Sequence, residues 1–135
     1  MDFFYNLLPF LVVIMLGVML GQLFSKRAVS RTAQKDRIIV VPYEEFRKHM
    51  RKGQLIDIRK QRDFEADRIK GARNFSPRFL RSKKQTLVRR DQDLYLYCHR
   101  GMRAKRLAKK LLSRFHRRII VLEGGFQSAK KGNDR

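Results

Sequence analysis

Hydrophobic and polar positions divide the chain into a long apolar segment and a body that alternates two patterns. Residues 3–24 contain no charged side chain, whereas the body alternates short apolar runs with longer amphipathic stretches. Runs this short and this rich in β-branched and aromatic residues predict β-strands. They lie at residues 38–41, 55–58, 94–97 and 119–122, with a weaker run near residues 73–75.

Two stretches of the body predict helices. Residues 42–53 open on a proline, carry two glutamates in the first turn and end on a glycine, all of which favour a helix there. Residues 104–115 place their apolar side chains at helical spacing in a single stripe. A shorter helical turn is expected over residues 64–69. Because strands and helices alternate, the pattern predicts an α/β fold with a mostly parallel sheet flanked by helices.

The apolar segment predicts one transmembrane helix ahead of this fold. As a helix, residues 3–24 would extend roughly 33 Å, enough for a hydrocarbon core of about 30 Å. Asp2 is the only charge before the segment, whereas Lys26 and Arg27 follow it closely. A cleaved signal peptide would need a basic start and a small-residue cleavage site, and neither is present. The positive-inside rule therefore predicts a single-pass plasma-membrane protein with its N-terminus outside and its body in the cytoplasm, a bacterial arrangement.

The predicted organisation has four parts. They are a transmembrane anchor at residues 1–24, a polar basic linker at 25–36, a folded domain at 37–131 and a tail at 132–135. Gly17 and Gly21 form a G-x-x-x-G spacing that favours close approach of two helices. Such spacings are frequent in apolar segments, so a homodimer through these glycines is a weak prediction.

Composition narrows the function classes. The chain has 135 residues and a formal net charge of +21, with 33 Lys and Arg against 12 Asp and Glu. A hydrophobic content of 43% argues against a disordered polybasic tail. One cysteine excludes an intrachain disulfide and a cysteine-rich zinc site, and no other residues have metal-ligand spacing. Neither a metal nor a cofactor is expected.

The positive charge suggests partners but does not select one. Between Asp93 and Glu123 there are nine Lys and Arg and no acidic residue. This face either is solvated or contacts an anionic lipid surface. Nucleic acid would bind to such a charge non-specifically, and we expect no specific nucleic-acid partner, since no groove-reading motif is present.

The candidate chemistry centres on the single cysteine. Cys98 follows the run at 94–97 directly, and the loop His99-Arg100-Gly101-Met102-Arg103 separates it from the helix predicted downstream. Ligands of parallel sheets bind at the carboxyl ends of strands. Loop N–H groups and the positive end of the following helix would form an anion cradle, and the same field would stabilise a thiolate. We therefore interpret Cys98 as a reactive thiol rather than as an inert buried residue.

Three motifs in this order resemble those of single-domain rhodaneses, a family of sulfurtransferases. They are Leu55-Ile56-Asp57-Ile58-Arg59 with Phe64 and Ile69-Lys70-Gly71-Ala72-Arg73-Asn74, then Tyr95-Leu96-Tyr97-Cys98 with its HRGMR loop, and finally Val121-Leu122-Glu123-Gly124-Gly125-Phe126. The resemblance covers residues 37–131, nearly all of the body.

The resemblance implies a rhodanese-like sheet and a persulfide mechanism. Cys98 would take the sulfane sulfur of a small anionic donor such as thiosulfate and pass it to an external thiophilic acceptor, in cells a thiol. The donor would be held by His99, Arg100, Gly101, Met102 and Arg103. Asp57 and Arg59 would support the loop, although they could equally form a purely structural ion pair.

Two other function classes stay open. One is a rhodanese-type module that binds or senses sulfur compounds without turnover, and the other is a basic domain that binds lipid or nucleic acid. Cysteine phosphatases with a similar cradle use a C-x5-R loop, whereas only four residues separate Cys98 from Arg103. The shorter loop favours sulfur transfer over dephosphorylation.

Overall fold

The computed structural model describes residues 9–22, 37–84, 86–115 and 117–133. The chain divides into two compact units, residues 1–35 and residues 36–135. In the first unit, residues 9–22 are helical and expose their large apolar side chains. No helix of the described residues is both long enough and apolar enough to cross a membrane. Of the predicted anchor and linker, residues 1–8 and 23–36 lie outside the described residues.

A five-stranded parallel sheet forms the centre of the second unit, in the order β1-β5-β4-β2-β3. The strands are β1 (Ile38–Val41), β2 (Gln54–Asp57), β3 (Arg73–Asn74), β4 (Leu94–Tyr97) and β5 (Ile119–Leu122). The α/β class and the parallel sheet predicted from the sequence are confirmed. Residues of β2, β4 and β5 are buried throughout, which explains why β4 and β5 are continuous apolar runs, whereas β2 also buries the polar side chains of Gln54 and Asp57.

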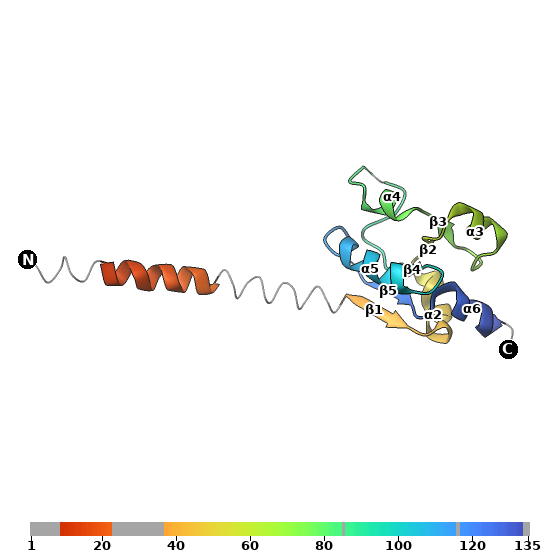
Figure 1. Ribbon diagram of the computed structural model, residues 1–135, viewed down its shortest axis with the longest axis horizontal. Helices are drawn as coiled ribbons and strands as arrows, with labels where there is room; N and C mark the ends of the chain where they lie inside the picture. The colour runs from red at the N-terminus through yellow and green to blue at the C-terminus, as the bar shows by residue number, and fades with distance from the viewer. Residues whose placement is uncertain (1–8, 23–36, 85, 116, 134–135) are drawn as a thin grey trace, which may run out of the picture. The chain divides into compact units, whose positions relative to one another are not determined.

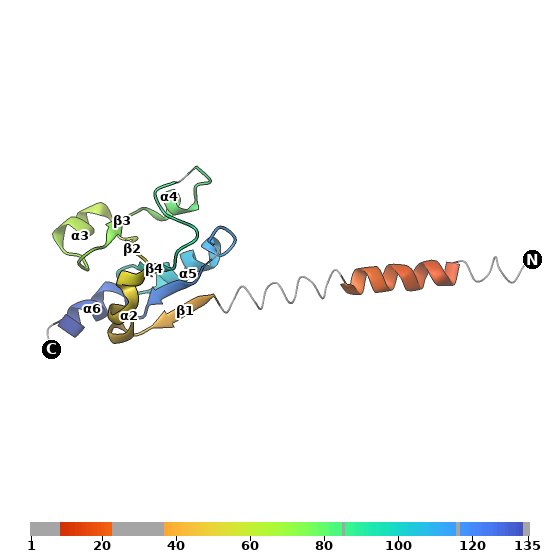
Figure 2. The same cartoon turned by 180° about the vertical axis from the view of Figure 1, so that it is seen from behind.

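Helices cover both faces of the sheet, as the two opposite views show (Figures 1 and 2). They are α2 (Tyr43–His49), followed by the short 3-10 helix η1 (Met50–Lys52), then α3 (Gln61–Ala66), α4 (Pro77–Arg81), α5 (Met102–Leu111) and α6 (Gly125–Asn133). Leu94 and Leu96 of β4 pack in one core cluster with α4 and α5. Tyr95 and Tyr97 of the same strand pack in the other with α2 and α6, as expected for side chains that alternate across a strand.

Two helices were not predicted from the sequence. Helix α4 is short and is capped by Ser76, whose hydroxyl accepts a hydrogen bond from Phe79 N at 3.1 Å. Helix α6 begins at a glycine pair that is typical of a turn, and it extends to Asn133, past the boundary expected at residue 131. Both helices have a structural role in the domain. Helix α4 closes one core cluster, and α6 lies behind the cysteine loop.

Candidate active site

Cys98 lies at the carboxyl end of β4, directly before the first turn of α5. Its side chain is only 2% exposed. The Sγ atom accepts hydrogen bonds from the backbone N–H groups of Gly101 and Ala104, with N···Sγ distances of 3.1 Å and 3.4 Å. Gly101 is the N-cap of α5 and has a φ of +84°, a left-handed conformation that favours glycine. Backbone donors and the positive end of a helix therefore converge on the sulfur.

The turn that starts α6 holds the cysteine loop from behind. Phe126 N donates to Cys98 O at 2.7 Å, and Gln127 N donates to His99 O at 3.2 Å. Gly125 has a φ of +61°, and a Cβ on it would lie 2.6 Å from Gly101 N. No side chain fits between these two backbones, so glycine is required at position 125 by the close approach as well as by φ.

In front of Cys98 lies a cavity of about 920 Å³. Four of the five loop residues predicted to hold the donor line it, namely His99, Arg100, Met102 and Arg103. All four are exposed, whereas Gly101 is buried and contributes its N–H group. Their roles in donor binding stay predictions.

The charge of the cavity wall is mainly positive. Its cations are Arg59, Lys60, Arg62, Arg100, Arg103 and Lys130, and its acids are Asp63 and Asp67. A cavity with this balance at a helix N-terminus favours an anionic ligand. Within the described residues, no group of three or more His, Cys, Asp and Glu side chains could hold a metal ion.

Asp57 and Arg59 form a buried ion pair beside the site. Arg59 Nη2 donates to Asp57 Oδ2 at 2.7 Å, and the side chains are 5% and 0% exposed. Although burial lowers the pKa of Arg59, the hydrogen bond and charge of Asp57 raise it by more. The guanidinium lies 3.8 Å over the ring of Phe126 and donates to Asp67 O at 2.6 Å. Arg59 also forms part of the cavity wall, and support of the loop by this pair stays a prediction.

The same pair affects the neighbouring Tyr97. Burial, and then the negative charge of Asp57, raise the pKa of the Tyr97 phenol well above its usual range. The phenol oxygen accepts the N–H group of Ile69 at 3.3 Å. Tyr97 therefore stays protonated at any physiological pH and acts as a core residue.

Some contacts at the site were not predicted from the sequence. Ala104 supplies a backbone N–H donor to Cys98 Sγ. An apolar residue in a helical pattern gives no indication of such a contact. Gln127 Nε2 lies within hydrogen-bonding distance of His99 Nε2, at 3.2 Å. Phe126 was expected only as part of a turn, yet its backbone holds the cysteine loop and its ring contacts Arg59. In the sequence, only the pair Gly124-Gly125 indicated that the segment around Phe126 lies close to another part of the chain.

Comparison with known proteins identifies the class of protein. Residues 42–131 match the model of the rhodanese-like domain, so the chain belongs to the rhodanese-like domain family. It is 42% identical over 84 residues to the uncharacterized protein YqhL of Bacillus subtilis. That match covers 62% of this chain and 66% of YqhL, so the chain spans slightly less than two thirds of that relative.

Solved structures share the fold. Reduced CoADR-RHD of Bacillus anthracis superposes with a TM-score of 0.60 at 26% identity, over 70% of this chain and 17% of that one. The human single-domain sulfurtransferase TSTD1 superposes with a TM-score of 0.53 at 22% identity, over 68% of this chain and 95% of that one. The second likeness concerns the fold alone.

Proposed function

We propose that this protein is a rhodanese-type sulfurtransferase that carries a sulfane sulfur on Cys98. Membership of the family is consistent with sulfur transfer or sulfur binding. The observation that carries the proposal is the cradle itself, in which Gly101 and Ala104 N–H groups point at Cys98 Sγ below a positively charged cavity. A buried thiol kept only for packing needs neither the converging N–H groups nor the charged cavity.

The first half-reaction loads sulfur onto the cysteine. The Cys98 thiolate attacks the outer sulfur of an anionic donor such as thiosulfate and forms a new S–S bond. The S–S bond of the donor breaks, and its electron pair leaves with sulfite. Backbone N–H groups from Gly101 to Ala104 would hold the terminal persulfide sulfur, while Arg100 and Arg103 would attract the anionic end of the donor.

The second half-reaction removes the outer sulfur from the Cys98 persulfide. An acceptor thiolate attacks the outer sulfur of the persulfide, the S–S bond to Cys98 breaks, and its electron pair returns to Cys98 Sγ. The acceptor leaves as a persulfide and the enzyme thiolate is restored, so no external oxidant or reductant is consumed. Since the chain has one cysteine, the acceptor must come from another molecule.

Sulfite release tests this proposal against a module that binds without turnover. Thiosulfate alone should release about one sulfite per protein from the persulfide step, and added thiol acceptor should make release continuous. The Cys98→Ser variant should release none under either condition. A single stoichiometric burst that no acceptor extends would favour a sulfur-binding module. Absence of sulfite release from thiosulfate would refute sulfur transfer from this donor.

We further propose that residues 3–24 anchor the protein in a plasma membrane, with the N-terminus outside and the catalytic domain in the cytoplasm. The support is the absence of charge in this segment and the exposed apolar side chains of residues 9–22. The basic face near α5 would then contact anionic lipid. The test is extraction of the full chain from bacterial membranes: it should resist alkaline carbonate and dissolve in detergent. Release by carbonate alone would refute the anchor.

A further inference from the structure

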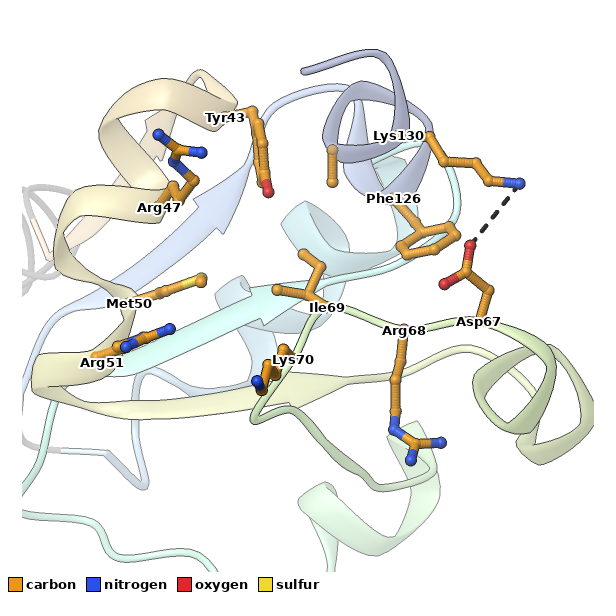
Figure 3. Close-up of a pocket in the computed structure, with 11 residues that line it drawn as sticks. Tyr43, Arg47, Met50, Arg51, Asp67, Arg68, Ile69, Lys70, Phe126 and Lys130 are labelled. Atoms are coloured by element: carbon orange, nitrogen blue, oxygen red, sulfur yellow. Dashed lines mark ion pairs between the residues drawn. The ribbon is translucent and has the colours of Figure 1, made fainter. Parts of the chain in front are cut away.

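A second cavity, of about 660 Å³, opens on the α2 and α6 side of the domain. Tyr43, Met50, Ile69 and Phe126 form its floor and are each 6% or 7% exposed. Figure 3 shows these side chains converging from α2, α6 and the segment around Ile69. Its volume lies within the range of small-molecule pockets. The occupant that it fits is therefore a small molecule with an apolar or ring-shaped part.

The rim of this cavity is positively charged. Arg47, Arg51 and Lys70 are exposed, and within the residues that the structure describes none of them has an ion-pair partner. Arg47 of α2 and Arg51 of η1 both line the cavity, so two cations from neighbouring helices lie on its rim. Arg68 is directed elsewhere, with its guanidinium 4.9 Å over the ring of Phe64. A positively charged rim of this kind favours a ligand with phosphate-type anionic groups.

The second cavity adjoins the cavity of Cys98. Asp67, Phe126 and Lys130 line both of them. Phe126 is also the residue whose N–H group donates to Cys98 O at 2.7 Å, so its backbone touches the nucleophile's own residue. The boundary is completed by the Asp67–Lys130 ion pair at 3.8 Å, drawn as a dashed line in Figure 3. Both side chains are about half exposed or more, and such a pair rearranges at little cost.

We propose that the second cavity binds the anionic, ring-bearing part of a small thiol whose reactive end accepts sulfur from Cys98. The inference rests on the proposed sulfurtransferase function and names the class of its acceptor. The ring packs on the floor formed by Tyr43 and Phe126, and the anionic groups pair with Arg47 and Arg51. A flexible arm then crosses the boundary at Lys130 and brings the thiolate to the persulfide. The transfer is the balanced exchange given above, with the thiol leaving as its persulfide.

The test compares two thiols that share one reactive arm. Coenzyme A carries phosphates and an adenine ring, whereas pantetheine has the same thiol arm without them. The full chain, in nonionic detergent, is loaded with thiosulfate, and the rate of sulfur transfer to each thiol is measured. The test variant is Arg47→Glu/Arg51→Glu. The control is Lys105→Glu/Lys109→Glu, which reverses two exposed charges at the same spacing on α5, away from both cavities.

The wild type should transfer sulfur to coenzyme A about tenfold faster than to pantetheine, the size expected for charge-assisted contacts. The double variant at Arg47 and Arg51 should lose this preference and keep both its loading by thiosulfate and its rate with pantetheine. The α5 control should keep the preference. An equal rate for the two thiols in the wild type would overturn the proposal, as would equal losses in the variant and the control.

A second measurement separates failure of this inference from failure of the proposed function. Calorimetry measures binding of adenosine 3′,5′-bisphosphate, which has no thiol, to the Cys98→Ser protein with and without the Arg47→Glu/Arg51→Glu change. Binding should weaken about tenfold in the presence of that change. Equal binding would overturn the second cavity as the anion site even where sulfur loading succeeds. Absence of loading from every donor would instead refute the sulfurtransferase function, and the acceptor role with it.

Discussion

Replacing Asp57 by alanine removes the carboxylate that neutralises a buried guanidinium. Asp57 is fully buried and accepts Arg59 Nε at 2.9 Å, Nη2 at 2.7 Å and the backbone N–H at 2.8 Å. After the change, the polar contact left to that guanidinium is the one to Asp67 O. Loss of one partner of a buried pair costs about 3–5 kcal/mol.

Such a loss is large for this domain. A domain of this size has a total stability of about 5–15 kcal/mol. One kcal/mol shifts the melting temperature of a domain of about 100 residues by roughly 4–8 °C, so Asp57→Ala should lower it by roughly 12 °C or more. The assay is thermal unfolding of the full chain followed by circular dichroism at neutral pH.

A matched pair on the surface provides the control. Arg89 and Asp91 are also two residues apart and form an ion pair at 2.9 Å, but their side chains are 64% and 66% exposed. The Asp91→Ala variant should unfold close to the wild-type temperature, because exposed pairs contribute little. Equal shifts for Asp57→Ala and Asp91→Ala would show that burial does not set the cost, and the reasoning would be wrong.

Three further predictions concern the turn behind the cysteine, the partly buried carboxylate of Asp93 and the cavity wall. Gly125→Ala should reduce both stability and sulfur transfer, measured by denaturant unfolding and sulfite release, because its Cβ would meet loop backbone at 2.6 Å. Burial raises the pKa of Asp93, but hydrogen bonds from Arg118 outweigh it and lower that pKa below its usual value near 3.8. The stability that Asp93 contributes is therefore present above pH 4 and lost below it, so the wild type and Asp93→Asn should converge in acid unfolding series. Arg103→Ala should raise the KM for thiosulfate several-fold, whereas Arg106→Ala, one turn further along the exposed face, should not.

Three strands could be predicted because short runs of apolar, β-branched and aromatic residues leave a direct trace in the sequence. The strands β1, β4 and β5 begin and end at the predicted residues, since each is a continuous apolar run. Helix α5 was predictable for a similar reason, because its buried residues follow one stripe. Helix α6 was not, since it starts at a glycine that is typical of a turn and its buried side chains are few.

The candidate site also has features that the sequence predicts and features that it does not. The position of Cys98 follows from the end of a strand and a basic loop that contains glycine, all of which are local features. The contacts of Phe126 with the cysteine loop depend on a pairing of segments distant in sequence, which one sequence does not reveal. Burial distinguishes the ion pair of Asp57 and Arg59 from the exposed pair of Arg89 and Asp91, and the identical spacing in the sequence does not reveal that difference.

The most direct test of the central claim is the intact mass of the full chain after incubation with thiosulfate. The account predicts a gain of one sulfur, about 32 Da, on the wild type, removed by a reductant and absent from Cys98→Ser. Alkylation of untreated protein serves as the control that the thiol is accessible. An unchanged mass on protein whose Cys98 is still alkylated, repeated with other anionic sulfane-sulfur donors, would contradict the claim that this cysteine carries sulfur.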